Sequence, residues 1–304
     1  MACPWQNVHV AVLGCGKESP SAYLPNLAAD DRLGFMGTAI LQGLLNKTRQ
    51  DDSPSIRYTT WVRSQTSSER LEHTLGDDWK RVRCVAGGDA VQAVVPADIV
   101  ILGFPPGALQ SVFATPGLVG ALRRKLIISL LAGVSYSQLQ AAMSGTGSPD
   151  LSLLRVIPSI GAKINDSVTL IAETAATTHQ HRQVAVWMFD QLGQTQWLPE
   201  SIMDEATATG AACNALTMVA VDAIVDASVA EGIPRPAALK LAAASLRSAA
   251  GLLLDGGMTP ESLKESMSVP KGITINSVLD LERGHVRSAI SDAVRHAIQY
   301  TRDM

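Results

Sequence analysis

The chain has 304 residues, a net charge of −3 and 46% hydrophobic residues. This length suits two domains, and the hydrophobic share excludes a disordered chain. The small negative charge excludes a strongly basic nucleic-acid binder, and no apolar stretch reaches about 20 residues free of charge, so we expect no nucleic-acid or membrane partner. The four cysteines form no CxxC pair and no metal-binding spacing with histidine. They predict reduced thiols, no metal site and a cytoplasmic location.

The chain begins with a short apolar run that ends in glycine. Residues 8–13 read VHVAVL, and Gly14-Cys15-Gly16 follows, while residues 35–45 (FMGTAILQGLL) are typical of a helix. Without residues 17–34 the segments join as a strand, a G-x-G-x-x-G turn and a helix, which is the dinucleotide-binding fingerprint. The residues that this fingerprint predicts at the cofactor phosphates are Gly14, Gly16, Phe35, Met36 and Gly37.

Residues 17–34 interrupt the fingerprint. They are largely polar, contain two prolines and show no helical or strand period. One interpretation is an unspliced intron in the gene model, because the segment is in frame and Gly16-Lys17-Glu18 can be encoded with a donor-like GTAAG. The other is a genuine surface insertion. We expect the chain that contains this segment to fold, but with a disrupted phosphate cradle.

Apolar runs alternate with helical segments through the first two thirds of the chain. This alternation predicts a doubly wound sheet with helices on both faces. We place a nucleotide-binding domain at 1–199. The predicted strands after the first are 56–62, 82–85, 97–102, 126–131, 153–157 and 168–172, and the predicted helices between them are 67–75, 87–95 and 135–143.

The turns after the predicted strands carry the remaining candidate cofactor residues. The second strand ends in Trp61-Val62-Arg63-Ser64 and offers no acid to a ribose 2′-hydroxyl. Arg63 and Ser64 suit a 2′-phosphate instead, which favours NADPH over NADH, although an exposed arginine without a ligand is the plainer alternative. The turns after the fourth and fifth strands add Phe104-Pro105 and Ala132-Gly133.

Residues 200–304 differ in composition from the first domain. Residues 205–255 are rich in alanine and predicted helical, with a break near Gly232-Ile233-Pro234, and 260–267 and 273–282 predict further helices. Helices that are apolar nearly all round need partners on most sides. We therefore expect an all-α domain that forms a homodimer or a higher homo-oligomer of dimers.

Several segments together resemble the pyrroline-5-carboxylate reductase family. They are VLGCG…MGTAILQGLL, LIISLLAGVSYSQLQ, RVIPSIGAKINDSVTLIA, EGIPRPAALKLAAASLRSAAGLLL and, most specifically, SLKESMSVPKGITINSVLDLERGHVRSAI. The resemblance covers nearly the whole chain apart from 17–34. It implies a Rossmann-type domain, a helical dimerisation domain, and the NAD(P)H-dependent reduction of the cyclic imine 1-pyrroline-5-carboxylate to L-proline.

The resemblance also implies a substrate site. Thr274 matches the threonine that hydrogen-bonds the imine nitrogen, and is the candidate catalytic residue. Lys271, Gly272 and Ile273 match the turn whose backbone binds the substrate carboxylate. A helix beginning near Ile273 agrees with this role, because the free N–H groups and the dipole at a helix amino terminus favour an anion. Helix capping by the hydroxyl of Thr274 is the plainer explanation.

Five departures from the family pattern leave the activity open. Residues 157–161 read Ile-Pro-Ser-Ile-Gly where the family has Met-Pro-Asn-Thr-Pro, and 211–215 replace Gly-Ser-Gly-Pro-Ala. Phe104 stands for a lysine, Lys271 for a glycine and Val269 for a hydroxyl residue. Two alternatives to proline biosynthesis follow: a paralogous reductase acting on another cyclic imine in specialised metabolism, or a non-catalytic dimerising paralogue with a broken cofactor loop.

Overall fold

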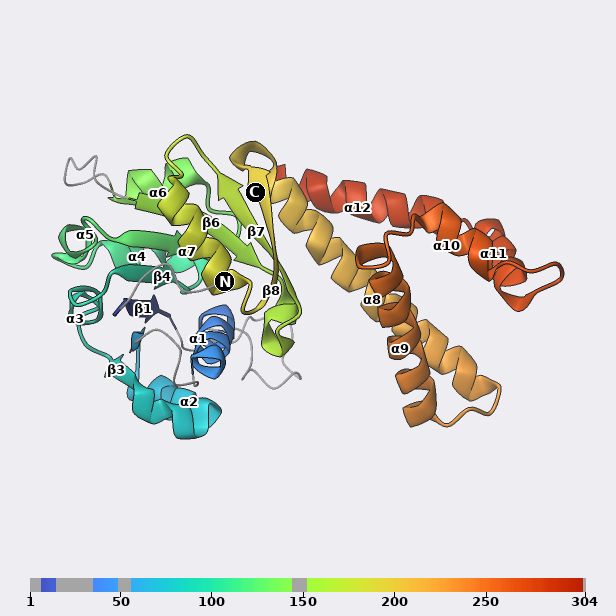
Figure 1. The fold of residues 1–304 in the computed structure, drawn as a ribbon, viewed down its shortest axis with the longest axis horizontal. Coiled ribbons are helices and arrows are strands. Elements are labelled where there is room, and N and C mark those ends of the chain that lie inside the picture. The colour runs from blue at the N-terminus through green and yellow to red at the C-terminus, as the bar shows by residue number, and fades with distance from the viewer. Residues whose placement is uncertain (1–6, 15–34, 49–55, 144–151, 303–304) are drawn as a thin grey trace. The chain divides into compact units, whose positions relative to one another are not determined.

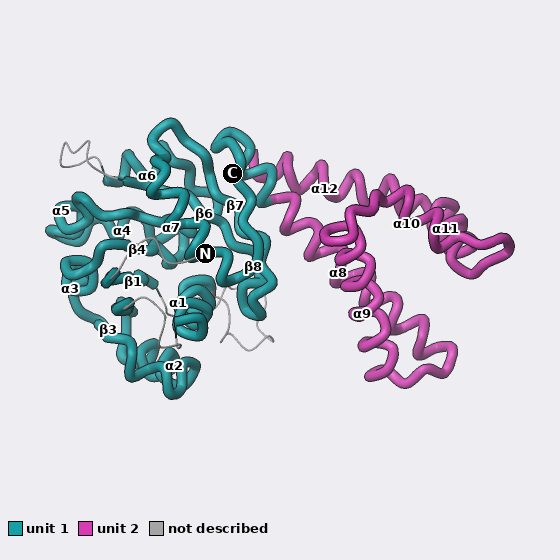
Figure 2. The backbone as a smooth tube through the Cα atoms, in the orientation of Figure 1, with its two compact units in different colours: residues 1–207 teal, residues 208–304 magenta. Residues whose placement is uncertain are grey.

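A computed structural model describes residues 7–14, 35–48, 56–143 and 152–302 (Figure 1). The chain divides into two compact units, residues 1–207 and 208–304 (Figure 2). The first unit holds the sheet and the second is all helical, which agrees with the predicted fold class. The interrupting segment 17–34 lies outside the described residues.

The first unit is built on an eight-stranded sheet in the order β3-β2-β1-β4-β5-β6-β7-β8. Neighbouring strands are parallel except β6 and β7, which are antiparallel. Seven of these strands match predicted ones, whereas β8 was not predicted. The strands are β1 (His9–Leu13), β2 (Arg57–Val62), β3 (Val82–Ala86), β4 (Ile99–Leu102), β5 (Leu126–Ser129), β6 (Ser152–Pro158), β7 (Ser167–Glu173) and β8 (Gly193–Pro199).

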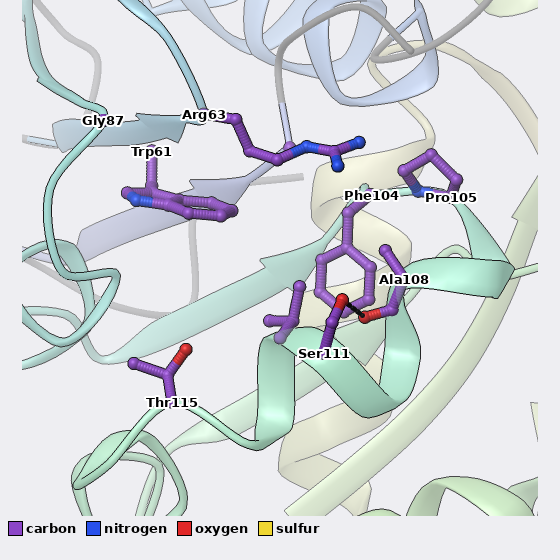
Figure 3. Close-up of a pocket in the computed structure, with 10 residues that line it drawn as sticks. Trp61, Arg63, Gly87, Phe104, Pro105, Ala108, Ser111 and Thr115 are labelled. Atoms are coloured by element: carbon purple, nitrogen blue, oxygen red, sulfur yellow. Dashed lines mark hydrogen bonds between the residues drawn. The ribbon is translucent and has the colours of Figure 1, made fainter. Parts of the chain in front are cut away.

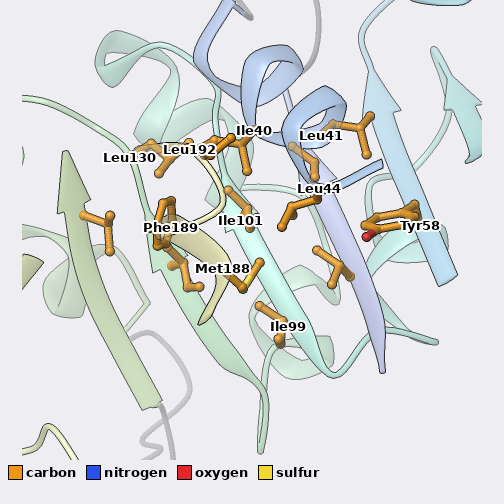
Figure 4. Close-up of a cluster of buried hydrophobic side chains, with 14 of the residues drawn as sticks. Ile40, Leu41, Leu44, Tyr58, Ile99, Ile101, Leu130, Met188, Phe189 and Leu192 are labelled. Atoms are coloured by element: carbon orange, nitrogen blue, oxygen red, sulfur yellow. The ribbon is translucent and has the colours of Figure 1, made fainter. Parts of the chain in front are cut away.

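Helices cover both faces of the sheet, so the central strands are buried on both faces. In β1, Val10 and Val12 belong to one apolar cluster, while Ala11 and Leu13 belong to the other. Figure 4 shows the first cluster between α1, the sheet and α7. Double burial explains the nearly continuous apolar runs of these strands. The first cluster involves α1 (Phe35–Lys47), α2 (Gln65–Leu75) and α7 (His179–Phe189); the second involves α3 (Val91–Val94), α4 (Leu109–Phe113), α5 (Leu118–Ala121) and α6 (Tyr136–Met143).

The helical unit exposes much of its apolar surface. In α8, Met218 and Val219 are 67% and 71% exposed, and in α9 Leu241 is 60% exposed. Contrary to the expectation from sequence, both helices are long and apolar enough to cross a membrane by length and composition alone. The helices are α8 (Met203–Ala230), whose first turn belongs to the first unit, α9 (Arg235–Leu254), α10 (Pro260–Met267), α11 (Ile273–Arg283) and α12 (Val286–Arg302).

A buried histidine lies where β1 begins. His9 is 6% exposed, and its Nε2 lies 2.7 Å from Oγ1 of Thr59. Its Nδ1 is buried and has no hydrogen-bond partner among the described residues. Burial is the largest influence on this imidazole and lowers its pKa from the ordinary 6.5, and the nearby Arg57 lowers it further. The folded protein therefore holds His9 neutral.

This histidine predicts a loss of stability in mild acid. Below pH 6.5 the unfolded chain binds a proton at His9 that the folded chain excludes, so the contribution is complete above that pH and declines below it. We expect the free energy of unfolding, from urea titrations at about pH 7.5 and about pH 5.5, to fall less in His9→Gln than in the parent. His181, whose pKa burial also lowers, is present in both proteins and cancels from the comparison. The exposed His179→Gln is the control, and a His9→Gln slope equal to that of the parent would refute the assignment.

Candidate functional site

The candidate cofactor site lies where the strand order of the sheet reverses. β1 lies between β2 and β4, and ligands of open α/β sheets bind outside the carboxyl ends of the strands at such a point. A cavity of about 330 Å³ opens there (Figure 3). It is lined by residues that follow β1 to β4 and by residues of α4 and its flanks: Gly14, Trp61, Arg63, Gly87, Phe104, Pro105, Ala108, Ser111, Val112 and Thr115.

Close backbone packing at Gly14 shapes the floor of this cavity. Gly14 has φ +99°, and a Cβ placed there would lie 2.5 Å from the backbone nitrogen of Phe104. A Cβ at Gly103 would lie 3.2 Å from the Cα of Gly37, so the start of α1 meets the end of β4 through backbone atoms. Gly14 and Gly37 thus occupy the packing positions that the fingerprint predicts, although Gly16 lies outside the described residues.

The rim beside β2 combines an aromatic ring with a cation. The indole Nε1 of Trp61 donates a hydrogen bond of 2.9 Å to the carbonyl of Gly88, which fixes the ring. The guanidinium of Arg63 extends over the cavity toward Phe104 and Pro105 (Figure 3). Ser64 is the N-cap of α2, and its Oγ accepts a hydrogen bond from the backbone N–H of Ser67. A flat aromatic wall beside a guanidinium suits a nucleotide that carries an anionic substituent.

The other predicted cofactor residues lie outside this cavity. Phe35 and Met36 are the first two residues of α1. Ala132 and Gly133 are exposed in the turn after β5, which is next to β4 at the same edge of the sheet, and Gly133 has φ +72°. A long dinucleotide that leaves the cavity along this edge would pass the β5 turn. The predicted residues therefore include a cavity group, which is Gly14, Arg63, Phe104 and Pro105, and an edge group in the turn after β5, which is Ala132 and Gly133.

The predicted substrate residues lie together in the helical unit. Gly272 is the N-cap of α11, and a Cβ placed there would lie 2.7 Å from Cγ2 of Val269. Lys271 just before it adopts a left-handed conformation, with φ +61°. Thr274 is half-buried in the first turn of α11, whose N-cap makes no side-chain hydrogen bond, so the helix-capping explanation for Thr274 is wrong. An uncapped helix start favours an anion.

Reasoning from sequence missed several residues that line the cavity. Trp61 carried a usable signal, because it precedes Arg63 by two positions in a strand and so points to the same side. Ser111 and Thr115 carried none, because α4 was not predicted. Within the described part of the chain, no group of three or more histidine, cysteine, aspartate or glutamate residues is placed to hold a metal ion.

Comparisons with known proteins show the family to which the chain belongs. Residues 200–304 match the family model "Pyrroline-5-carboxylate reductase dimerisation", and residues 33–133 match "NADP oxidoreductase coenzyme F420-dependent". The chain is 33% identical to a pyrroline-5-carboxylate reductase of Lophium arboricola, over 87% of this chain and 88% of that protein. It is also 33% identical to the Delta-1-pyrroline-5-carboxylate reductase kk1I of Curvularia clavata, over 94% of this chain and 92% of that protein.

A solved structure shares the fold along the whole chain. It is the pyrroline carboxylate reductase of Plasmodium falciparum with NADP bound, with a TM-score of 0.74 at 17% sequence identity. The match covers 97% of each chain. It confirms the expected succession of a Rossmann-like sheet and a helical domain.

The packing at Gly14 predicts an unequal response to two alanine substitutions. Gly14→Ala combines a positive φ with a backbone clash and should cost more than about 2 kcal/mol of unfolding free energy. Gly87→Ala is the control, because its φ is +66° but the nearest atom to an added Cβ lies 3.6 Å away. It should cost only about 1 kcal/mol, the penalty for the left-handed conformation. Urea titrations measure both values, and equal losses would show that the close approach at Gly14 is unimportant.

Proposed function

Because the chain belongs to the pyrroline-5-carboxylate reductase family, we propose that it reduces 1-pyrroline-5-carboxylate to L-proline with NADPH. Family membership makes it a pyrroline-5-carboxylate reductase-like, NAD(P)-dependent oxidoreductase. The observation that carries the proposal is the pairing of two features in one chain. One is the nucleotide-shaped cavity at the strand switch point, and the other is the uncapped helix start at Gly272.

The cavity residues fit a dinucleotide phosphate. The approach at Gly14 leaves no room for a Cβ, so backbone rather than a side chain would face the pyrophosphate. Arg63 would bind the 2′-phosphate of the adenosine half, and Phe104 and Pro105 would form a wall beside it. The bound cofactor supplies the hydride that the imine carbon receives.

The helix start at Gly272 fits the imine carboxylate. The N–H groups of Ile273 and Thr274 and the dipole of α11 would bind the carboxylate, and the ammonium group of Lys271 adds attraction. The hydroxyl of Thr274 would hydrogen-bond the imine nitrogen. An iminium is a better hydride acceptor than a neutral imine, so a hydroxyl that orients this nitrogen and a donor water promotes the reaction.

We further propose that the helical unit forms the dimer of a homo-oligomer. The dimerisation model matches residues 200–304, and α8 and α9 expose Met218, Val219 and Leu241. A second copy would bury this surface, which a monomer leaves in water. The same apolar surface accounts for the membrane-like composition of the two helices without a membrane.

A second candidate function is the reduction of a different cyclic imine. In the turn after β6, the hydroxyl of Ser159 accepts a hydrogen bond from the backbone N–H of Val168. The next side chain, Ile160, is 62% exposed where the family pattern has a threonine. The turn thus offers an apolar side chain where a hydroxyl is expected, which favours an imine with a larger apolar ring. Assays of NADPH oxidation with pyrroline and piperidine imine carboxylates separate the two candidates.

The role of Thr274 predicts a loss of turnover in Thr274→Val. Removing the hydroxyl while keeping the shape should lower kcat/KM for the imine at least about tenfold, as expected for one lost hydrogen bond to a polar reacting group. Thr274→Ser keeps the hydroxyl and should retain most of the activity. Steady-state kinetics with NADPH measure both, and unchanged turnover in the valine variant would remove Thr274 from the reaction.

The position of Arg63 predicts the choice between cofactors. In the chain with Gly16 joined directly to Phe35, NADPH should bind several-fold more tightly than NADH, and Arg63→Glu should reduce or reverse this preference by repelling the 2′-phosphate. Arg57→Glu makes the same change of charge at the opposite end of β2 and serves as the control. Fluorescence titration gives the dissociation constants. Tighter binding of NADH by this shortened chain with Arg63 intact would contradict the assignment.

The interrupting segment predicts a difference between two lengths of chain. A variant in which Gly16 is joined directly to Phe35 restores the tight turn and should bind NADPH with micromolar affinity or better. The parent should fold, since a longer loop costs only about 0.6 kcal/mol per doubling of length, but bind NADPH poorly. Calorimetry on both proteins decides. Equal and tight binding would identify 17–34 as a genuine loop that lies clear of the cofactor, whereas no binding by either would favour the non-catalytic paralogue.

A further inference from the structure

A buried arginine in the central sheet joins three separate parts of the first unit. Arg155 in β6 is 1% exposed, although it is a long charged side chain. Its Nη1 donates a hydrogen bond of 3.1 Å to Oε1 of Glu200, and its Nη2 contacts the carboxylate of Asp204. Glu200 lies in the short helix Glu200–Ile202, and Asp204 lies in the first turn of α8.

The same carboxylate oxygen also holds the turn after β5. Oε1 of Glu200 accepts a hydrogen bond of 3.0 Å from the backbone N–H of Tyr136, which is the first residue of α6. Ala132 and Gly133 lie just before Tyr136, and β5 delivers the chain to this turn from Ser129, the partner of Arg155 in the sheet. One oxygen atom thus connects the buried guanidinium to the turn of the edge group.

The first turn of α8 has a separate apolar anchor. Met203 is fully buried and packs with Ile157 of β6 and Ala172 of β7. The start of α8 therefore has an attachment to the sheet besides its contact with Arg155.

Stability alone is a poor reason for a charge in this position. A buried ion pair repays its desolvation only with full hydrogen bonding, and an apolar replacement is often as stable. Here Nε of Arg155 and Oε2 of Glu200 are buried and have no hydrogen-bond partner among the described residues. The cluster instead fixes the position of the Glu200 carboxylate, because a planar guanidinium holds a bound carboxylate in a defined geometry.

We propose that Arg155 is a positioning residue, which holds the 132–136 turn through Glu200 in the place where the nicotinamide half of the cofactor binds. This inference rests on the proposed cofactor site. Ala132 and Gly133 are exposed and Gly133 is left-handed, while Val134 just after them is buried, so the hydrogen bond to Glu200 adds to the packing that holds the turn. The adenosine half of the cofactor occupies the Trp61–Arg63 cavity, which shares no residue with the Arg155 cluster.

Hydrogen exchange in the 304-residue protein tests the first half of the proposal without any ligand. In Arg155→Met, the amides of 132–139 should exchange at least about tenfold faster, as expected when a hydrogen bond to a charged group is lost, while those of β1 and β4 stay protected. Arg155→Lys keeps the charge without the fork and should lie between parent and Met. Asp204→Asn is the matched control, because Asp204 contacts Arg155 but not the turn, and should change these amides less than about twofold.

The binding of NADPH and of a fragment of it tests the second part of the proposal, that the turn lies where the nicotinamide binds. Arg155→Met should weaken NADPH several-fold and leave adenosine 2′,5′-bisphosphate unchanged, because the latter lacks the nicotinamide half. Faster exchange throughout the domain, or equal weakening of both ligands, would show a merely structural arginine and overturn the proposal, as would unchanged exchange of 132–139. If the Met variant does not fold, Arg155→Lys decides by the same comparisons. If neither the parent nor the chain with Gly16 joined to Phe35 binds either ligand, the proposed cofactor function fails, while exchange alone still decides what Arg155 positions.

Discussion

The close approach of backbone at Gly14 is the constraint on which the rest of the first unit depends. β1, β4 and the start of α1 meet here, with no space for a Cβ at Gly14 and little at Gly103. Because side chains are excluded, the strand ends can converge, and the backbone N–H of Gly14 is free to donate to the carbonyl of Trp61 at 2.9 Å. The cavity, the ring of Trp61 and the guanidinium of Arg63 are arranged around this point. The candidate cofactor site is therefore a consequence of how the sheet is closed against α1.

Much of the fold could be predicted because burial on both faces leaves a local signature. β4 and β5 read as continuous apolar runs, and four of the four residues in each are buried. β8 lacks this signature, since it is the last strand of the sheet and each of its residues is half-buried or exposed. The reversed direction of β7 follows from a short connection. The helix Ile160–Ile164 returns the chain beside β6, and a link this short joins antiparallel rather than parallel strands.

The candidate site divides in the same way between local and tertiary information. Gly14, Gly37 and Arg63 could be predicted because a turn motif and a strand end place them. Ser111, Thr115 and the contacts of Arg155 could not, because they depend on which strands become neighbours. The predicted helix 87–95 shows that local sequence can also mislead about where a helix begins and ends. Gly87 has φ +66° and begins a turn, so that the helix α3 includes only Val91–Val94.

Two departures from the family pattern lie in turns whose backbone is closely defined. Ser159 replaces an asparagine, yet its N–H donates to Ser167 and its hydroxyl accepts from Val168, so the turn after β6 is still closed by hydrogen bonds. Lys271 replaces a glycine, yet it keeps a left-handed φ of +61°, at a cost of about 1 kcal/mol or more for a residue with a Cβ. The fold and the cofactor domain follow from family membership, whereas the apolar Ile160 and the cationic Lys271 give these two turns functional groups that differ from the family pattern.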